Sequence, residues 1–239
     1  MSSSDRSEGL SFHEALPVPI LVQPLRNARR MRLRFDEGRG VLKLTCPQRM
    51  SRRTALAWAA EQRGWVETQL ARLAPAEPFA AGARIPIEGR EIELVWSAGE
   101  RRTPRLAEGQ LICGGPEAAF PKRVEAFLKR LAVEILSCET TEIAEIAGVV
   151  PRSVSVGDAS TRWGSCSGEK RIRYSWRLIL APPEARRYVV AHEVAHLVHL
   201  NHGAEFKALE CRLFGDDVAA ARSLLRRCGP RLKRIGRGG

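Results

Sequence analysis

Four of the five histidines in this 239-residue chain lie within eleven residues, at His192, His196, His199 and His202. The first two belong to an H-E-x-x-H sequence, with Glu193 directly after His192. Residues four positions apart project from the same face of a helix, so the imidazoles of His192 and His196 can bind one metal ion. Zinc in catalytic sites takes three protein ligands and one water molecule, and Glu193 can reach that water without binding the ion.

The candidates for the third ligand lie just beyond the first two histidines. His199 shares their helix face, but seven residues span about 10.5 Å of an unbroken helix, too far for it to share an ion with the first histidine. If the helix ends near Asn201, which tolerates left-handed backbone, the chain can turn back and bring His202 to the ion. The resulting spacing equals that of the metzincin pattern, except that a histidine replaces the metzincin glycine. We therefore expect His202 as the third ligand, with Glu205 or Glu210 as the alternative.

The elements around this cluster are predicted from their sequence patterns. Pro182 and Pro183 favour a helix over residues 183–200, because proline fits the first helical turn. A strand over residues 172–180 precedes it, and helices from about residue 204 and over 216–227 follow it. Further upstream, the sequence predicts a helix over 121–146 that ends at Gly148, and a short strand around Val154 and Val156.

The first half of the chain alternates apolar and polar residues around turns, which is typical of β-hairpins. Hairpins are predicted over residues 31–47, with a turn over 36–40, and over 85–96 around Gly89, with a further strand over 111–113. Ser51 is a favourable N-cap for one helix over residues 52–73. The Gly114–Gly115–Pro116 sequence is the clearest linker, and we place the domain boundary there.

Composition excludes several classes of protein. The chain is 44% hydrophobic and 28% charged, which is ordinary for a folded domain and unlike a disordered, collagen-like or disulfide-rich chain. No apolar run approaches the roughly 20 residues of a membrane helix, and the start does not resemble a secretory signal. Six cysteines without a C-x-x-C pair do not suggest a disulfide framework. We expect a cytoplasmic protein that does not bind membranes.

Positive charge is concentrated at the two ends of the sequence. Residues 1–74 contain 13 basic and 7 acidic groups, and residues 222–239 contain 7 basic and no acidic groups. Such clusters could bind a nucleic-acid backbone, but they also suit a solvated surface, which we favour because no aromatic residue lies among the terminal arginines. The predicted organisation is a flexible N-terminus (1–17), a β-rich domain with one long helix (18–115), a catalytic domain (116–227) and a basic disordered tail (228–239).

With these residues in hand, the chain resembles the YgjP-like, SprT-related family of zinc metallopeptidases from about Val18 to Leu225. The resemblance is carried by three segments, an R-W-G-S-C sequence, the strand that follows it, and the helix with H-E-x-x-H-x5-H. These are residues 162–166, 172–179 and 188–206. Arg29 to Arg34 and Trp65 also resemble the amino-terminal region of that family. Lys207 departs from it, because an aromatic residue is common at this position.

The resemblance implies an α+β fold in which a small β-rich domain precedes a zincin-like catalytic domain with a short antiparallel sheet. It implies one zinc ion held by His192, His196 and His202. Glu193 would then act as the general base in the hydrolysis of a protein or peptide substrate. We expect the strand over 172–180 to pair with an extended peptide, as edge strands of zincins do.

Further expectations concern the residues around the predicted metal site. Substrate-binding candidates are Arg162, Trp163, Ser165 and Tyr174. Tyr188 lies one helical turn before His192 and could bond within the site, although a core role is more typical.

Two other classes of function remain open from the sequence. The first is a metal-dependent hydrolase acting on or at nucleic acid, either an endoribonuclease similar to YbeY or an SprT-like protease of DNA-attached proteins. Glu193 counts against the former, because YbeY-type proteins lack this glutamate. The second is a nucleic-acid-binding module with structural zinc, which would need a fourth ligand from His199 or a cysteine.

Overall fold

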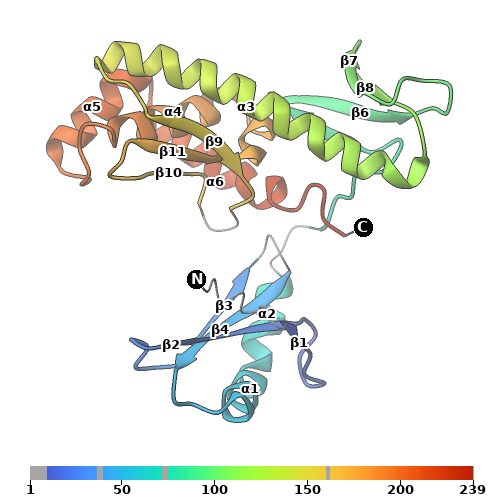
Figure 1. Ribbon diagram of the computed structural model, residues 1–239, viewed down its shortest axis with the longest axis vertical. Helices are drawn as coiled ribbons and strands as arrows, with labels where there is room; N and C mark the ends of the chain where they lie inside the picture. Colours follow the sequence, from blue (N-terminus) through green and yellow to red (C-terminus); the bar gives the residue numbers. More distant parts are fainter. Residues whose placement is uncertain (1–9, 37–39, 72–74, 160–161, 239) are drawn as a thin grey trace, which may run out of the picture. The chain divides into compact units, whose positions relative to one another are not determined.

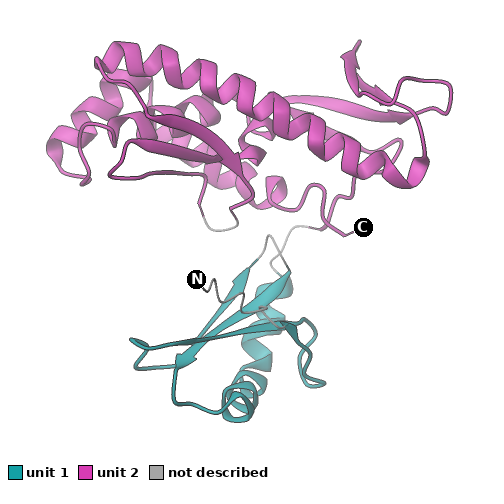
Figure 2. Ribbon diagram, viewed as in Figure 1, with its two compact units in different colours: residues 1–74 teal, residues 75–239 magenta. Residues whose placement is uncertain are grey.

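The computed structural model describes residues 10–36, 40–71, 75–159 and 162–238. The chain is a mixed α+β protein with several small sheets, as expected (Figure 1). It divides into two compact units, residues 1–74 and 75–239 (Figure 2). Each unit is described by itself.

Unit 1 is a four-stranded sheet with two helices. The strands pair in the order β1-β2-β4-β3, with β1 Leu10–Ser11, β2 Ile20–Leu25, β3 Arg32–Asp36 and β4 Val41–Pro47. Strands β3 and β4 are antiparallel, which confirms the predicted hairpin, although residues 37–39 of its turn lie outside the described residues. Of the predicted flexible N-terminus, residues 1–9 also lie outside, while β1 pairs with β2 and Leu16 is buried.

The helix predicted over residues 52–73 is two helices in the structure, α1 Arg52–Glu61 and α2 Arg63–Ala71. Ser51 caps the first as expected, because its Oγ accepts a hydrogen bond from the Thr54 amide at 3.1 Å. Apolar periodicity continues across the break, with Ala59 and Val66 both buried, so spacing alone did not reveal it.

Unit 2 begins with a second sheet in the order β5-β6-β8-β7 and the long helix α3. The bounds are β5 Arg84–Ile87, β6 Arg90–Trp96, β7 Arg105–Ala107, β8 Gln110–Cys113 and α3 Phe120–Ala147, preceded by the 3₁₀ turn η1 Glu117–Ala119. The hairpin around Gly89 and the helix end at Gly148 are as predicted, and both glycines have positive φ.

The boundary between units lies after residue 74 and not at Gly114–Pro116. This sheet and α3 share one core, in which Leu94 and Leu111 pack with Val124 and Leu128. The predicted linker is a packed junction, because a Cβ on Gly114 would lie 2.1 Å from the Glu100 carbonyl oxygen. Composition identified the glycines but not the close backbone approach that they permit.

The remaining elements of unit 2 surround the histidine cluster. A third sheet has the order β10-β11-β9, with β9 Ser153–Gly157, β10 Gly164–Cys166 and β11 Arg171–Ser175. It is mixed, because β10 is antiparallel to β11 while β9 is parallel to it; the expected sheet was antiparallel. The rest are the 3₁₀ helix η2 Trp176–Leu180, α4 Pro183–Ala195, α5 Ala204–Phe214 and α6 Val218–Leu232.

The C-terminal segment belongs to unit 2 and packs against the rest of it. The prediction of a disordered tail from residue 228 is therefore wrong. Helix α6 continues to Leu232, and both Leu232 and Ile235 are buried in the core. The buried Arg177 guanidinium donates to the carbonyl oxygens of these two residues. Arg237 forms an ion pair with Asp158. The tail arginines therefore serve partly to fix the chain end.

We expect deletion of residues 230–239 to destabilise unit 2 by at least about 3 kcal/mol. The deletion removes two buried apolar side chains and leaves the Arg177 guanidinium without its carbonyl acceptors. Urea denaturation of the full chain and the deletion variant measures the effect. Arg227→Gln, an exposed change in α6, is the control, and an unchanged unfolding midpoint in the deletion variant would contradict the expectation.

Candidate active site

Helix α4 carries the site and is buried along most of its length. Pro183 occupies its first turn, as predicted, and nine of its residues are buried. Arg186 fixes it to α3 through a bidentate bond to the buried carboxylate of Glu139, with Nη2 2.8 Å from Oε1. Apolar contacts and this ion pair together fix the position of helix α4. His192 and Glu193 lie in its last turn.

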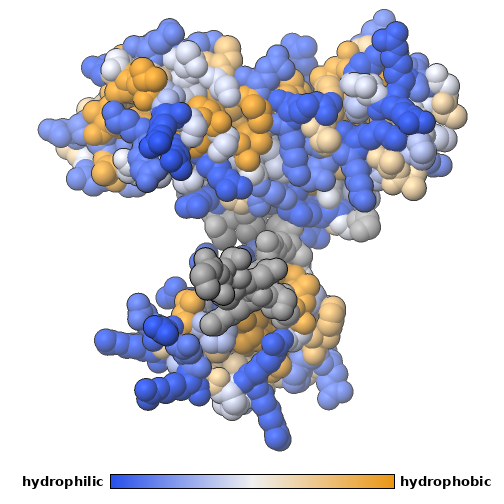
Figure 3. All heavy atoms as spheres, viewed as in Figure 1, coloured by the Kyte–Doolittle hydropathy of each residue, from blue (hydrophilic) through white to orange (hydrophobic). Residues whose placement is uncertain are grey.

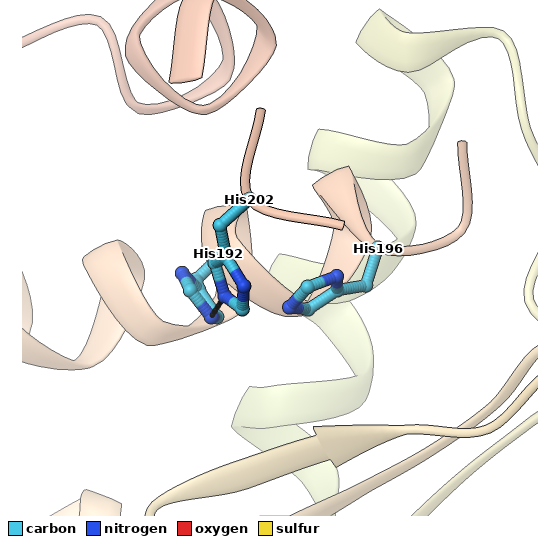
Figure 4. A group of neighbouring side chains, drawn as sticks. All are labelled: His192, His196 and His202. Carbon is cyan, nitrogen blue, oxygen red and sulfur yellow. Dashed lines mark hydrogen bonds between the residues drawn. The ribbon is translucent and has the colours of Figure 1, made fainter. Parts of the chain in front are cut away.

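The rings of His192, His196 and His202 point toward one another (Figure 4). One ring nitrogen from each residue lies within 4.8 Å of the others. Nε2 of His192 is 3.4 Å from Nε2 of His202. The first two rings come from the end of α4 and the third from the loop after it. Two nitrogens bound to a tetrahedral zinc ion at about 2.1 Å would be about 3.4 Å apart, so this separation fits one ion.

Two hydrogen bonds determine which ring nitrogens carry lone pairs. His192 Nδ1 lies 2.6 Å from the Glu210 carboxylate, and His196 Nδ1 lies 3.1 Å from the carbonyl oxygen of His199. Both oxygens accept hydrogen bonds, so each Nδ1 carries the proton. In the neutral rings, Nε2 then presents a lone pair to the centre of the cluster, which is the form that binds a metal. Burial lowers the pKa of His196 and favours this neutral state.

Phe206 forms an apolar support for all three rings. It is buried, and its ring centroid lies 4.5–5.1 Å from those of the three histidines. Helix α5 presents Phe206 and Glu210 on one buried face, so the same helix supports the rings and accepts from His192.

The alternative third ligands occupy other positions. Glu205 is 87% exposed and pairs with His199 at 3.7 Å, away from the cluster. Glu210 is buried and bonds to the far nitrogen of His192, so it orients a ring. The turn also differs from expectation, because α4 ends at Ala195 and Asn201 is absent from the described non-glycine residues with positive φ. Asn201 Oδ1 instead accepts from the Gly203 amide.

Glu193 is 5% exposed, and its side chain projects from α4 against Gly164 of β10. A Cβ on Gly164 would be 2.5 Å from Glu193 Oε1, so the glycine of the R-W-G-S-C sequence makes room for this carboxylate. Glu193 Oε2 has no hydrogen-bond partner among the described residues. Burial raises the pKa of Glu193 to about 7, and the positive charge of Arg162 acts against this rise.

The sequence-family model of the YgjP-like metallopeptidase domain matches residues 29–227, about four fifths of the chain. The chain belongs to the YgjP-like family. It thus carries a metallopeptidase domain, and this membership does not favour the nucleic-acid alternative. No curated protein and no solved structure matches the chain.

The predicted substrate-binding residues of this YgjP-like domain differ in how close they lie to Glu193. Arg162 and Trp163 line a pocket together with His192 and Glu193. Ser165 lines neighbouring pockets that do not include Glu193.

Tyr174 borders the same neighbouring pocket as Ser165, but it is only 1% exposed and belongs to the core of the YgjP-like domain. Its role as a substrate-binding side chain stays a prediction. Its hydroxyl lies 3.0 Å from Thr140 Oγ1 in α3.

The expected substrate strand over residues 172–180 is also corrected. Its first part, β11, is the central strand between β10 and β9, so its main chain is already paired, and its second part is the 3₁₀ helix η2. The edge of this sheet next to α4 is β10, which follows Trp163. Order along the sequence placed the strand beside the helix but could not give its position within the sheet.

Sequence reasoning missed the supporting roles of Phe206 and Glu210 in the YgjP-like site. A signal was present, because Phe206, Leu209, Glu210 and Leu213 have helical spacing on one face. A carboxylate on an otherwise apolar face needs a buried partner, and the nearest histidines were candidates. Tyr188 combines the two roles weighed for it, because it is 7% exposed in the core and also lines the pocket beside His192, where its hydroxyl accepts from Arg222 Nε at 3.0 Å.

The remaining sequence expectations concern surfaces. Among the described residues, no helix has the length and apolar character needed to cross a membrane. The described part of unit 1 exposes an arginine cluster, and Figure 3 shows hydrophilic side chains projecting from this unit. The cluster consists of Arg26, Arg29, Arg30, Arg32 and Arg34.

Proposed function

We propose that this chain is a zinc-dependent peptidase in which His192, His196 and His202 hold one ion and Glu193 is the general base. The observation that carries the proposal is the convergence of three imidazoles, two of which are hydrogen-bonded so that their Nε2 lone pairs face inward. Lone pairs brought together without a proton or cation between them would repel one another. A divalent cation satisfies this arrangement.

The donor set supports zinc. Three neutral imidazoles and an open fourth position are typical of catalytic zinc sites, and the Glu210 carboxylate behind His192 is the kind of partner that fixes a ligating ring. When bound, zinc lowers the pKa of a water molecule toward about 7 and polarises a carbonyl group.

Glu193 supplies the proton transfers. A carboxylate with a pKa of about 7 accepts a proton from the attacking water and can return it to the leaving amine, since a group is an effective acid and base near its own pKa. Gly164 and the surrounding core keep this side chain fixed and largely away from bulk water.

We propose a protein or peptide in extended conformation as the substrate. The β10 edge can offer main-chain hydrogen bonds to such a peptide beside Glu193. A nucleic-acid partner has less support at the C-terminal segment, because Arg231 is bonded to Glu77 and Glu91, and Arg237 to Asp158.

The metal assignment is tested with His202→Ala. We expect this change to lower zinc affinity by more than about 100-fold, which is beyond the usual effect of an outer-sphere change, and to abolish hydrolysis of a fluorogenic peptide panel. Metal content measured by mass spectrometry, together with competition against a chelator, gives the affinity and identifies the ion in the purified protein.

His199→Ala is the matched control, because it removes a neighbouring histidine outside the cluster and should keep full metal content. Equal zinc affinity in wild type and His202→Ala would refute the ligand set. RNA cleavage by metal-loaded wild type without peptide cleavage would refute the peptidase assignment.

A further inference from the structure

A pocket of about 350 Å³ lies directly beside His192 and Glu193 within unit 2. Its walls combine apolar surface with three positively charged side chains. The apolar walls include Trp163, Val189 and Leu225, and the charged groups are Arg162, Arg222 and Arg226. A side chain with an apolar stem and an anionic end would match both features.

Two of the arginines come from one face of α6. Arg222, Leu225 and Arg226 have i, i+3 and i+4 spacing, which places the two guanidinium groups one turn apart with a buried leucine between them. Like charges at i and i+4 destabilise a helix. An anion bound between the two groups would remove this repulsion.

Arg222 is held in place by the site itself. Its Nε donates to the Tyr188 hydroxyl at 3.0 Å, and its Nη2 lies 3.6 Å from Glu210 Oε2. Since Glu210 also accepts from His192, the arginine of the pocket and the histidine of the cluster share one buried carboxylate.

The other two arginines of the pocket, Arg162 and Arg226, are exposed. Neither has a hydrogen bond or ion pair to another described residue. Both guanidinium groups are thus available to a ligand, and Arg162 also lies close enough to Glu193 to oppose the rise of its pKa.

We propose that this pocket receives the substrate residue next to the scissile bond and that its arginines select a carboxylate there. The proposal rests on the peptidase function above and adds the substrate class. The carboxylate can come from an internal glutamate or aspartate side chain or from the C-terminus of the substrate. The apolar walls favour these over a nucleic-acid phosphate, which has no apolar stem.

The test compares peptides that are identical except for Glu or Gln at each position around the cleaved bond. We expect kcat/KM to be at least about tenfold higher for the Glu peptide at one position, as for a hydrogen bond to a charged group. Arg226→Glu should abolish or reverse this preference. Arg227→Glu has the same charge change one residue along, outside the pocket, and should retain it.

Two further peptides distinguish the sources of the carboxylate. One ends in a free carboxylate just beyond the cleaved bond, and the other has the same sequence with an amidated end. A preference for the free acid identifies an end-directed enzyme, whereas a preference for internal Glu identifies side-chain selection. Equal rates for all matched pairs would overturn the proposal.

A binding measurement separates this proposal from the peptidase assignment. Fluorescence anisotropy with Glu193→Gln gives dissociation constants for the same labelled Glu and Gln peptides. Tighter binding of the Glu peptide that Arg226→Glu abolishes supports the pocket even if no peptide is cleaved. Equal binding overturns the pocket even if wild type cleaves both. Competition by a single-stranded oligonucleotide that Arg226→Glu relieves would indicate a phosphate site and would also overturn it.

Discussion

Glu193→Gln is expected to abolish hydrolysis and, at the same time, to stabilise the metal-free protein at neutral and alkaline pH. Loss of the proton-transfer group should lower kcat/KM by about 10²- to 10⁴-fold. Zinc content should persist, because the three imidazoles are untouched. A fluorogenic peptide that wild type cleaves, assayed beside metal analysis of both proteins, measures the two effects. Full activity in the variant would refute the assigned base.

The gain in stability follows from the pKa of Glu193. Burial raises this pKa from 4.5 to about 7, so the folded state retains a proton that the unfolded state releases between these values. Below about pH 4.5, ionisation of the Glu193 carboxyl therefore does not change the free energy of unfolding. Between about pH 4.5 and pH 7 it lowers this free energy progressively, and above about pH 7 the penalty is constant at about 3 kcal/mol. Glutamine has no such penalty.

Urea denaturation with a chelator at pH 4.5 and pH 8 checks this difference. We expect the two proteins to unfold at similar urea concentrations at pH 4.5 and the variant to be more stable at pH 8. A difference independent of pH would indicate a packing effect, contrary to this account.

Gly164→Ala is expected to lower activity by about 100-fold without loss of metal, as displacement of a catalytic group by about 1 Å does. The added methyl group would lie 2.5 Å from Glu193 Oε1 and 2.7 Å from its Cγ, so the carboxylate must move. Steady-state kinetics and metal content measure both effects. Some loss of stability, about 1–3 kcal/mol, is typical of such overpacking.

Gly168→Ala is the matched control in the adjoining turn, because nothing lies within 4 Å of its Cβ position and its φ is not positive. It should retain wild-type activity. If Gly164→Ala were equally active, the space beside Glu193 would not be needed for catalysis.

Local features of the fold could be predicted from the sequence. The Ser51 cap, the Gly148 terminus, the start of α4 at Pro183 and the hairpin around Gly89 depend on a few neighbouring residues. The approach of His202 to the first two histidines was also foreseeable, since helix geometry limits which nearby side chains can meet. The mechanism of that turn was not, because several backbone conformations reverse a chain equally well.

Features that depend on distant residues could not be predicted. The position of β11 in the centre of its sheet is set by β9 and β10 together. The arginines after residue 228 appear to be a solvated tail in sequence, yet Arg231 pairs with Glu77, 154 residues away. Arg186 and Glu139, 47 residues apart, gave no pattern either. Such pairs arise only once the fold brings the elements together.

The packing of the C-terminal segment links the candidate site to a part of the sequence that lies far from the histidines. Trp163 beside the site lies against Gly229 and Lys233, and Arg177 binds the carbonyl groups of Leu232 and Ile235. The wall behind the pocket therefore depends on α6 and the residues after it, outside the H-E-x-x-H segment. A substitution there can change the environment of Trp163 while all three histidines keep their positions, so residues remote from the cluster in sequence belong to the same functional unit.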